Sequence, residues 1–538
     1  PKKILNIFVN LLEGDEADNN LNTIFSSTIL RSTTTKFIKD LGDLIVIPSN
    51  CLEEYTFNNQ TISVINKDET IKLIKSINSI GMDYFISVNG DSIDIDQIVS
   101  KVVATTNRDF LDSMIIQATI SKQILNYDNV LTIPSSVIEV IDTDTKIINK
   151  AELNQILDSL NTIGIGSDYT INDFATSIDV NMFFDFTEND LDGILKSQIF
   201  LATVGDKIKE AINSSESLSL PDVEIIDVET GKLVNVDYVN LGIDKQEIIR
   251  LINSIKILLG DNIDLNNFTF NANDFLEKQF SDEDIIKICS SKIISYNIGI
   301  IIEEENTIVG TFKNVLELSD VNWFYEEGSY KGDLVDLLGS LNKMYSNKTL
   351  KPLFEEFLNG NNSVGLSDLL NVEFCDYLTR SRVLINSFER FMPIIINKNN
   401  SQIINVNIND LSFPTENKQE YYRGEAIIDG ELYKFIEGMV KVSTLDNYTT
   451  IEDKDNMLND VKVILSSDLL NQTVTIQLFE KVEVLNMILQ LQGQEPLEIP
   501  DYNQPGFNLL TYNDGMLLDS YITTYLTYYS QLPKTNNK

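Results

Sequence analysis

The chain has 538 residues with 41 basic and 81 acidic side chains, and its formal charge of −40 argues against nucleic-acid binding, which depends on Lys and Arg that neutralise phosphates. Histidine is absent, which excludes Ser–His–Asp and Cys–His catalysis, His-ligated zinc and imidazole acid–base steps. Hydrophobic residues make up 43% of the chain, as in a packed globular protein, and at roughly 150 residues per domain its length suggests three or four domains.

The start of the chain does not resemble a targeting segment. It opens with Pro1-Lys2-Lys3, and its first apolar stretch, residues 4–12, is broken by Asn6 and Asn10 and lacks a small-residue cleavage site. No run in the sequence approaches the roughly 18–20 apolar residues of a membrane span. We therefore expect a soluble chain, or the soluble part of a longer one, without a signal peptide or a membrane span.

One short pattern recurs along the chain at intervals of 84 to 94 residues. It reads Ser, any residue, two apolar residues, two variable ones and then Thr, Asn or Ser, usually followed by another apolar residue. In the second copy, Ile116, Ile120 and Ile124 are four residues apart, so they lie on one face of a helix. The six copies therefore predict six related helices, which begin after Ser27, Ser113, Ser197, Ser291, Ser381 and Ser467.

A second pattern follows each copy of the first. In its first three copies, Asn66, Asn149 or Asp244 is followed three residues later by Glu, then by apolar residues at three- and four-residue steps. The Asn or Asp caps a helix N-terminus, and we expect the Glu to reach back to the cap as in a capping box. The run ends in a glycine suited to a left-handed C′ position, namely Gly81, Gly164 or Gly260.

Three weaker copies of the second pattern keep the seven-residue offset that separates Glu69 from Ser76. They run from Asp333 to Ser340, from Glu431 to Gly438 and from Asn513 to Ser520. The two patterns together divide the chain into six repeats, of which the last is divergent and terminal. The repeats comprise residues 1–93, 94–179, 180–270, 271–362, 363–455 and 456–538.

Each repeat is expected to be α+β, in the order helix, small β element or hairpin, helix and short connecting helix. Chain rich in β-branched residues separates the two helices, as at 44–48 and 130–134, and the third repeat offers a hairpin of 223–228 with 232–236. Residues 95–103 exemplify the short helix. The recurring serines indicate either close helix–helix approach or simple tolerance of Ser at half-buried positions. We expect an elongated tandem array with contacts mainly between neighbouring repeats.

Acidic clusters are candidates for calcium sites, which use carboxylate oxygens. Residues 188–193 imitate the first half of an EF-hand loop, but position 12 would be Ile199, where a bidentate Glu is needed. A solvated acidic surface is the favoured interpretation, with weak calcium binding at acidic loops as the alternative. We assign no catalytic, cofactor-binding or metal-ligating residue. The looser clusters are Asp91 with Asp94 and Asp96, and Asp142 with Asp144.

Cysteines and aromatic residues give no specific site either. The three cysteines, Cys51, Cys289 and Cys375, are scattered and form no CxxC pair, so we expect buried small hydrophobes rather than disulfides or a zinc site. The densest aromatic cluster is Trp323-Phe324-Tyr325, and the last repeat is rich in Tyr. Such groups are favoured at interfaces, but core filling and a capping terminal repeat are the preferred explanation.

The Ser-led helix, the Ile-Pro segment and the Glu-led helix that ends in Gly resemble long repetitive surface proteins of AT-rich, low-GC bacteria. The heavy use of Ile, Asn, Lys and Asp fits such a coding bias. The resemblance implies an extracellular, structural or adhesive role and transfers no functional residue. Phages of AT-rich hosts share the bias, so a virion component remains open.

The sequence therefore predicts a non-enzymatic structural or interaction protein, a segment of an extended acidic repeat array that is secreted or lies at a bacterial surface. Its expected partners are other proteins or neighbouring copies of itself, and neither nucleic acid nor a membrane. The alternative is a virion or extracellular filament subunit that packs against copies of itself. A carboxylate-based hydrolase is a remote third possibility.

Overall fold

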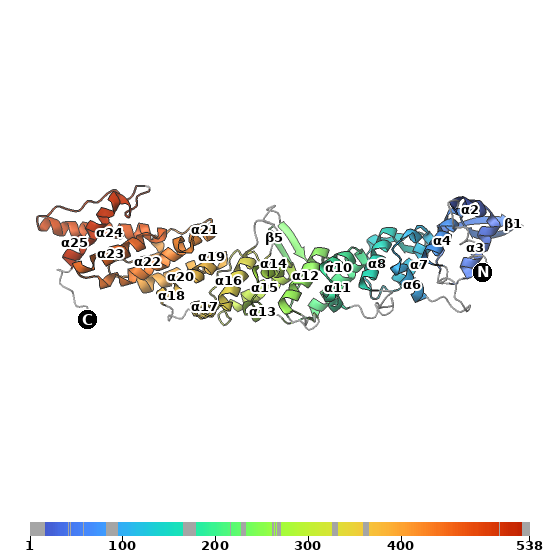
Figure 1. Cartoon of the computed structure of the whole chain (residues 1–538), viewed down its shortest axis with the longest axis horizontal. Helices are drawn as coiled ribbons and strands as arrows, with labels where there is room; N and C mark the ends of the chain where they lie inside the picture. Colours follow the sequence, from blue (N-terminus) through green and yellow to red (C-terminus); the bar gives the residue numbers. More distant parts are fainter. Residues whose placement is uncertain are drawn as a thin grey trace. The chain divides into compact units, whose positions relative to one another are not determined.

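The computed structural model of the chain is mostly helical, with small two-stranded antiparallel sheets (Figure 1). This agrees with the expected α+β class. The chain falls into two compact units, Pro1–Thr269 and Phe270–Lys538, which are taken in turn. The structure describes residues 17–40, 42, 45–57, 59–81, 95–164, 179–215, 217–226, 233–260, 263, 265, 269, 271–324, 332–358, 365–504 and 506–529.

The N-terminal compact unit combines helices with three hairpins. Its described helices are α2 (Ala17–Ile24), α3 (Thr28–Asp40), α4 (Lys67–Ile80), α6 (Ile95–Ala104), α7 (Met114–Leu125), α8 (Lys150–Ile163), α10 (Glu188–Ile194), α11 (Gln198–Ser214) and α12 (Lys245–Leu259). Its strands pair as β1 (Leu52–Phe57) with β2 (Gln60–Ile65), β3 (Ile138–Val140) with β4 (Lys146–Ile148), and β5 (Asp222–Ile226) with β6 (Leu233–Asp237). Helix α6 confirms the short helix predicted at 95–103.

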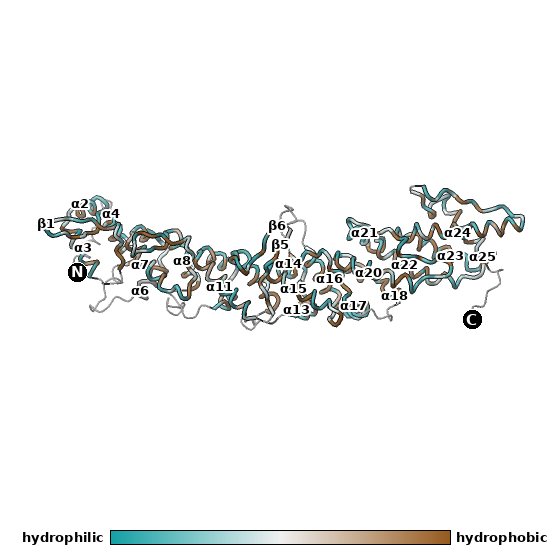
Figure 2. Tube along the Cα trace, turned by 180° about the vertical axis from the view of Figure 1, so that it is seen from behind, coloured by the Kyte–Doolittle hydropathy of each residue, from teal (hydrophilic) through white to brown (hydrophobic). Residues whose placement is uncertain are grey.

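The C-terminal compact unit has helices but no strand among its described residues. Hydrophobic and hydrophilic residues alternate along its helices, as expected where one face of each helix is buried (Figure 2). The helices are α13 (Ala272–Leu276), α14 (Asp282–Ser290), α15 (Lys292–Glu305), α16 (Asp333–Ser346), α17 (Leu350–Leu358), α18 (Leu366–Leu369), α19 (Val372–Arg380), α20 (Arg382–Asn399), α21 (Lys418–Arg423), α22 (Glu431–Thr444), α23 (Lys454–Leu465), α24 (Asp468–Leu491) and α25 (Met516–Tyr529).

All six Ser-led patterns form helices, as predicted, and the serine is the N-cap. Its hydroxyl oxygen accepts a hydrogen bond from the amide three residues later, for example from Ile116 to Ser113 at 3.3 Å and from Phe200 to Ser197 at 3.2 Å. This bond satisfies one of the orphan amides at the helix start. The serine therefore begins the helix, which is a role beyond the two that the sequence suggested for it. The six helices are α3, α7, α11, α15, α20 and α24.

The first three Glu-led helices, α4, α8 and α12, also begin and end where the sequence predicts. The side chains of Asn66, Asn149 and Asp244 each accept a hydrogen bond from the amide of the Glu three residues later, and a glycine with positive φ follows each helix. The predicted capping box is wrong for Glu69 and Glu152. Their carboxylates do not return to the cap but bind the hydroxyl of the next Ser-led helix.

The later Glu-led helices begin differently. Asp333 and Glu431 are the first residues of α16 and α22, whereas Glu69 is the third residue of α4. Glycine stands at the N-cap of α16 and α22, so no side chain caps these helices. Asn513 lies outside α25, in a 3₁₀ turn where its φ is 52°.

Hairpins account for the β structure, but they do not occur in every repeat. Strands β5 and β6 confirm the hairpin of the third repeat, and its predicted turn lies outside the described residues. The described residues of the fifth repeat include no strand, although Ile404, Val406 and Ile408 alternate with Asn. The chain that follows contains Pro414 and enters α21, so it offers no second strand for pairing.

The small residue of the second pattern lies where two helices approach closely. The Ser159 hydroxyl of α8 donates a hydrogen bond to the Ile194 carbonyl of α10 at 2.8 Å. At the same position of α22, a Cβ on Gly438 would lie 3.5 Å from the Cα of Ile464 in α23. Ile194 and Ile464 both stand three residues before an N-cap serine. These contacts support close approach as the reason for a small residue here.

All three cysteines are buried and free, as predicted. Burial raises the pKa of the Cys51 and Cys375 thiols to about 12. Burial also raises the pKa of Cys289 far above its usual value. The thiols therefore stay protonated at neutral pH, and they behave as small hydrophobic side chains.

Two serines at one repeat position are expected to respond oppositely to removal of the hydroxyl. Ser159→Ala removes the bond to Ile194 and should lower the stability by about 1 kcal/mol. The Ser340 hydroxyl of α16 is buried without a hydrogen-bond partner among the described residues, so Ser340→Ala should leave the stability unchanged or raise it by up to about 1 kcal/mol. Calorimetric unfolding measures both changes, and equal losses would contradict this assignment.

Candidate functional site

The most specific site of the N-terminal compact unit is a buried carboxylate bound to the first turn of a helix. Glu152 Oε1 accepts hydrogen bonds from the Ser197 hydroxyl at 2.6 Å and from the Ile199 amide at 3.0 Å. Its Oε2 accepts from the Gln198 amide at 3.1 Å. Ser197 is the N-cap of α11, so one side chain of α8 satisfies the start of a helix 45 residues further along the chain.

The same arrangement occurs at two other Glu-led helices, and we call it the carboxylate junction. In each case a buried Glu accepts from the hydroxyl of an N-cap serine and from the amide two residues after that serine. The distances are 2.6 and 2.9 Å from Glu69 to Ser113 and Ile115, and 2.5 and 2.9 Å from Glu431 to Ser467 and Leu469. Glu431 also accepts from the Asp468 amide at 2.9 Å.

The contact between α16 and α20 uses a shorter acidic side chain. Asp333 does not reproduce the glutamate geometry but binds the guanidinium of Arg382, the residue that follows the N-cap Ser381. Its two oxygens accept from Arg382 Nε at 3.1 Å and Nη2 at 2.7 Å. Such a bidentate, charge-assisted pair is directional, so the longer arginine compensates for the missing methylene of Asp.

A second contact also involves the Ser-led helix, and we call it the hydroxyl contact. It joins that helix to a segment earlier in the chain. Six residues after the N-cap serine, a Thr or Ser hydroxyl oxygen accepts a hydrogen bond from a backbone amide that lies 70 to 73 residues earlier. This contact accounts for the hydroxyl residue at that position in α7, α11 and α20. The amides of Val46, Thr132 and Glu317 donate to Thr119, Thr203 and Ser387 at 3.1, 2.9 and 2.9 Å.

The first turn of the helix presents donors that suit a carboxylate acceptor at the junction. The positive end of the helix dipole and the amides of the first turn stabilise an anion at a helix N-terminus. Burial raises the pKa of Glu431, and the hydrogen bonds from Ser467, Leu469 and Asp468 oppose that shift. Since these three groups all donate, a carboxylate that only accepts is the matching partner.

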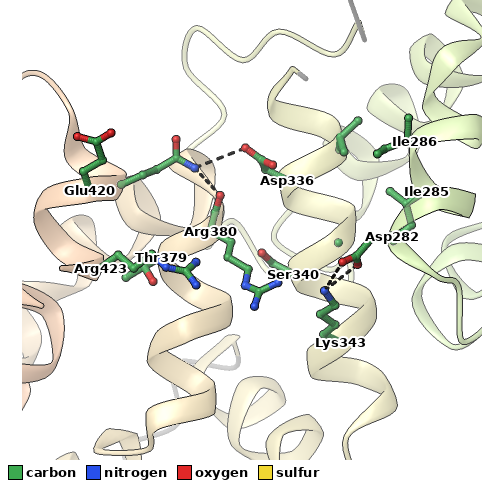
Figure 3. A pocket seen from close by; sticks show the side chains of 13 residues that line it. Asp282, Ile285, Ile286, Asp336, Ser340, Lys343, Thr379, Arg380, Glu420 and Arg423 are labelled. Atoms are coloured by element: carbon green, nitrogen blue, oxygen red, sulfur yellow. Dashed lines mark hydrogen bonds and ion pairs between the residues drawn. The ribbon is translucent and has the colours of Figure 1, made fainter. Parts of the chain in front are cut away.

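The C-terminal compact unit contains a cavity of about 470 Å³ between α14, α16, α19 and α21 (Figure 3). Its apolar wall is formed by Ile285, Ile286 and Val335. The remaining lining residues are polar or small: Asp282, Asp336, Gly339, Ser340, Lys343, Thr379, Arg380, Gln419, Glu420 and Arg423.

Charged groups around this cavity bind one another. Lys343 pairs with Asp282 at 2.7 Å, as the dashed lines in Figure 3 show. Asp376 of α19 bridges Arg380 and Arg423, with an N–O distance of 2.7 Å to each. The Lys343–Asp282 and Arg423–Asp376 pairs connect neighbouring helices, whereas the Arg380–Asp376 pair lies within α19. Among the described lining residues we find no nucleophile paired with a general base, so the cavity does not indicate catalysis.

Of the acidic segments considered for calcium, residues 188–193 form hydrogen bonds and an ion pair within the protein. Residues 188–193 lie in α10, where Asp190 forms a capping box with Thr187 and Asp192 pairs with Lys245 at 2.6 Å. Asp91 and Asp94 lie outside the described residues, and Asp96 belongs to α6. In the part of the chain that the structure describes, no three Cys, Asp or Glu side chains converge as a metal-ligand set.

Asp142 connects two segments of the N-terminal compact unit that are distant in sequence. Its carboxylate accepts from the Ser49 hydroxyl at 2.6 Å and the Ser49 amide at 3.1 Å, and from the Asp144 amide at 3.0 Å. The hydrogen bonds from Ser49, and then that from Asp144, lower the pKa of Asp142 well below its usual value. The carboxylate is thus engaged in a contact between two segments 93 residues apart.

The aromatic residues singled out from the sequence pack within the protein. The Trp323 ring covers Gly299 of α15, where a Cβ would lie 2.8 Å from the ring, and its indole N–H donates to Glu303 at 3.0 Å. Phe324 is buried, as is Tyr521 in the last repeat, while Tyr325 lies outside the described residues. These placements favour core filling.

Sequence reasoning identified the residues of the carboxylate junction but missed their pairing. The sequence predicts that the recurring Glu returns to its own helix cap, and it leaves either close helix approach or tolerance of a half-buried position as the reason for the recurring Ser. One signal was present in the sequence, because the Glu-to-Ser separation is 44 residues at Glu69 and 45 residues at Glu152. The similar separation at these two sites is a sequence signal of the contact, whereas at Glu431 the separation is 36 residues.

No single helix among the described residues is both long and apolar enough to cross a membrane. The successive helices α14 and α15 meet the criteria of length and composition only when taken together, and a bend of 104° separates them.

Comparison of the chain with models of protein families, with curated proteins and with solved structures finds no significant match.

Replacement of Glu152 by Gln tests the energetic weight of the carboxylate junction. The amide group of Gln keeps one acceptor but places an NH₂ against the donors of α11, so we expect a loss of about 2–4 kcal/mol in the free energy of unfolding. Denaturant unfolding measures the loss. Glu139→Gln on the exposed edge of β3 makes the same change in charge, and it should alter the stability by less than about 0.5 kcal/mol. Equal effects of the two variants would contradict a structural role of the junction.

The Ser49–Asp142 contact predicts a pH dependence. Because the pKa of Asp142 is lowered in the folded chain, its contribution to stability is complete above the unfolded value of about 3.9 and is lost as the pH falls through the folded value. A ¹³C-carboxyl NMR titration should place the Asp142 midpoint below about 3.9. Ser49→Ala removes the hydroxyl donor and should raise that midpoint. An ordinary midpoint that is insensitive to Ser49 would refute the contact.

Proposed function

We propose that the chain is a non-enzymatic structural or interaction protein, built as a tandem array of six repeats and belonging to an extended acidic protein that is secreted or lies at a bacterial surface. The carboxylate junction carries this proposal. Glu69, Glu152 and Glu431 use the same atoms to bind the N-cap serine of the following Ser-led helix. A contact that recurs in one register between successive repeats is characteristic of solenoid-type arrays.

The polar residues that recur in the sequence are used for architecture. The hydroxyl contacts at Thr119, Thr203 and Ser387 repeat in the same way as the junctions. The buried carboxylates are occupied by donors at hydrogen-bonding distance, which argues against a role as catalytic acid or base. This weakens the hydrolase alternative. The charge of −40 favours a soluble, self-repelling chain that occupies an extended surface.

Small-angle X-ray scattering of the purified chain tests the array. A single compact body of 538 residues would have a radius of gyration of about 24 Å, and an array whose repeats contact only their neighbours should exceed this value clearly. A radius of gyration at the compact value would overturn the proposal.

Sedimentation velocity over a wide range of protein concentrations, at physiological ionic strength, addresses the filament alternative. A concentration-independent monomer is the expected result, because like-charged chains repel one another. Reversible growth into longer assemblies would instead favour a self-packing virion or filament subunit.

A further inference from the structure

The first Ser-led helix, α3, presents its recurring face to solvent. Ile29 stands two residues after the N-cap Ser27 and is 78% exposed, and the adjacent Leu30 is 39% exposed. The residues at the Ile29 position in α7, α11, α20 and α24 are only 0–3% exposed. Those four residues are Ile115, Ile199, Val383 and Leu469.

The polar residues on this face of α3 are of the same types as those that later Ser-led helices use in their contacts. Ser27 accepts from the Leu30 amide at 3.5 Å as an N-cap should, but no carboxylate among the described residues accepts from its hydroxyl. Thr33, at the position of the hydroxyl contact, is exposed and donates to the Ile29 carbonyl at 2.9 Å, as Thr119 does to Ile115 at 2.7 Å. Helix α3 therefore carries the serine and the threonine that correspond to those of the carboxylate junction and the hydroxyl contact in later Ser-led helices.

The last helix of the second pattern, α25, lacks the residues that would bind this face of α3. Asn513 occupies the position of the junction glutamate, outside the helix and with a positive φ. Asp514 follows where Leu153 and Ile248 stand in α8 and α12, and both Asn513 and Asp514 are exposed. The C-terminal helix of a second copy therefore lacks both the carboxylate and the apolar neighbour that the face of α3 would receive.

We propose that the face of α3 formed by Ser27, Ile29, Leu30 and Thr33 is a docking surface for a Glu-led helix that is not among the described residues of this chain. The expected occupant is a helix whose first turn carries Glu and whose next residues are apolar. Helices of this kind cover the equivalent face of later Ser-led helices in the same chain. This inference rests on the proposed function, because it assumes that the carboxylate junction is the interface between repeats.

Charge on α3 is complementary to such a partner. Lys36 and Lys39 are exposed on this helix together with one acidic residue, Asp40, in a chain whose acidic residues outnumber its basic ones by two to one. Together with the anion-binding first turn of the helix, they favour an acidic segment over a basic one. Electrostatic complementarity of this kind raises the association rate and sets the orientation of docking.

A helical peptide with the sequence of residues 149–164 is a suitable probe, stapled between the exposed positions 158 and 162 so that it is helical in isolation. Fluorescence polarisation with the full chain should show saturable binding. Hydrogen exchange measured by mass spectrometry should show added protection within residues 25–40. The peptide variant Glu152→Gln should bind about tenfold more weakly.

Ile29→Lys in the full chain should also weaken binding by at least about tenfold, and since the side chain is exposed the variant should fold normally. Val309→Lys replaces another exposed apolar residue (92% exposed) and serves as the matched control that binds unchanged. Absence of saturation below about 1 mM, or equal binding by both peptides and both variants, would overturn the proposal. Self-association of the chain that Ile29→Lys abolishes would overturn it too, in favour of a second copy as occupant.

The outcomes separate the two proposals. If Glu152→Gln destabilises the full chain and the peptide fails to bind α3, the junction stands as an interface between repeats and only the docking surface is refuted. If Glu152→Gln has no effect on stability, the proposed function itself loses its main support.

Discussion

A carboxylate buried against the first turn of a helix is the interaction on which the rest of this architecture depends. Burial of an ionised Glu costs several kcal/mol unless donors surround it, and a buried helix start is equally costly without acceptors. At Glu152 the two groups satisfy each other, because the Ser197 hydroxyl and two amides of α11 donate and the carboxylate accepts. Neither the carboxylate nor the helix start is satisfied alone, so directional bonds define how α8 meets the start of α11.

The other recurring features follow from that geometry. Once α8 is held on the start of α11, the chain before α11 must pass close to α8, and the position of closest approach requires Ser159. In α22 the same position is Gly438, where even a Cβ would press against Leu470. The hydroxyl contact then fixes the extended segment of one repeat on the Ser-led helix of the next. Apolar residues fill the space that these polar contacts define.

Local features of this fold could be predicted from the sequence because their causes lie within one helical turn. The caps at Asn66 and Asn149 and the positive φ of Gly164 are examples. The destination of Glu69 could not be derived in this way, since a capping box and a carboxylate junction require the same residue types, and Ser113 is 44 residues distant. The missing hairpin of the fifth repeat has a similar cause, because a strand forms only where another segment can pair with it.

The common register of the junctions bears on how a gene for such a chain can change in length. Glu69 and Glu152 bind equivalent atoms of the helices that begin after Ser113 and Ser197. If recombination removed one whole repeat, Glu69 would lie opposite the Ser197 hydroxyl. Its carboxylate would then accept hydrogen bonds from donors equivalent to its present ones. In-register gain or loss of a repeat therefore leaves no buried charge unsatisfied, and selection on folding would tolerate variation in copy number more readily than single substitutions at the junction.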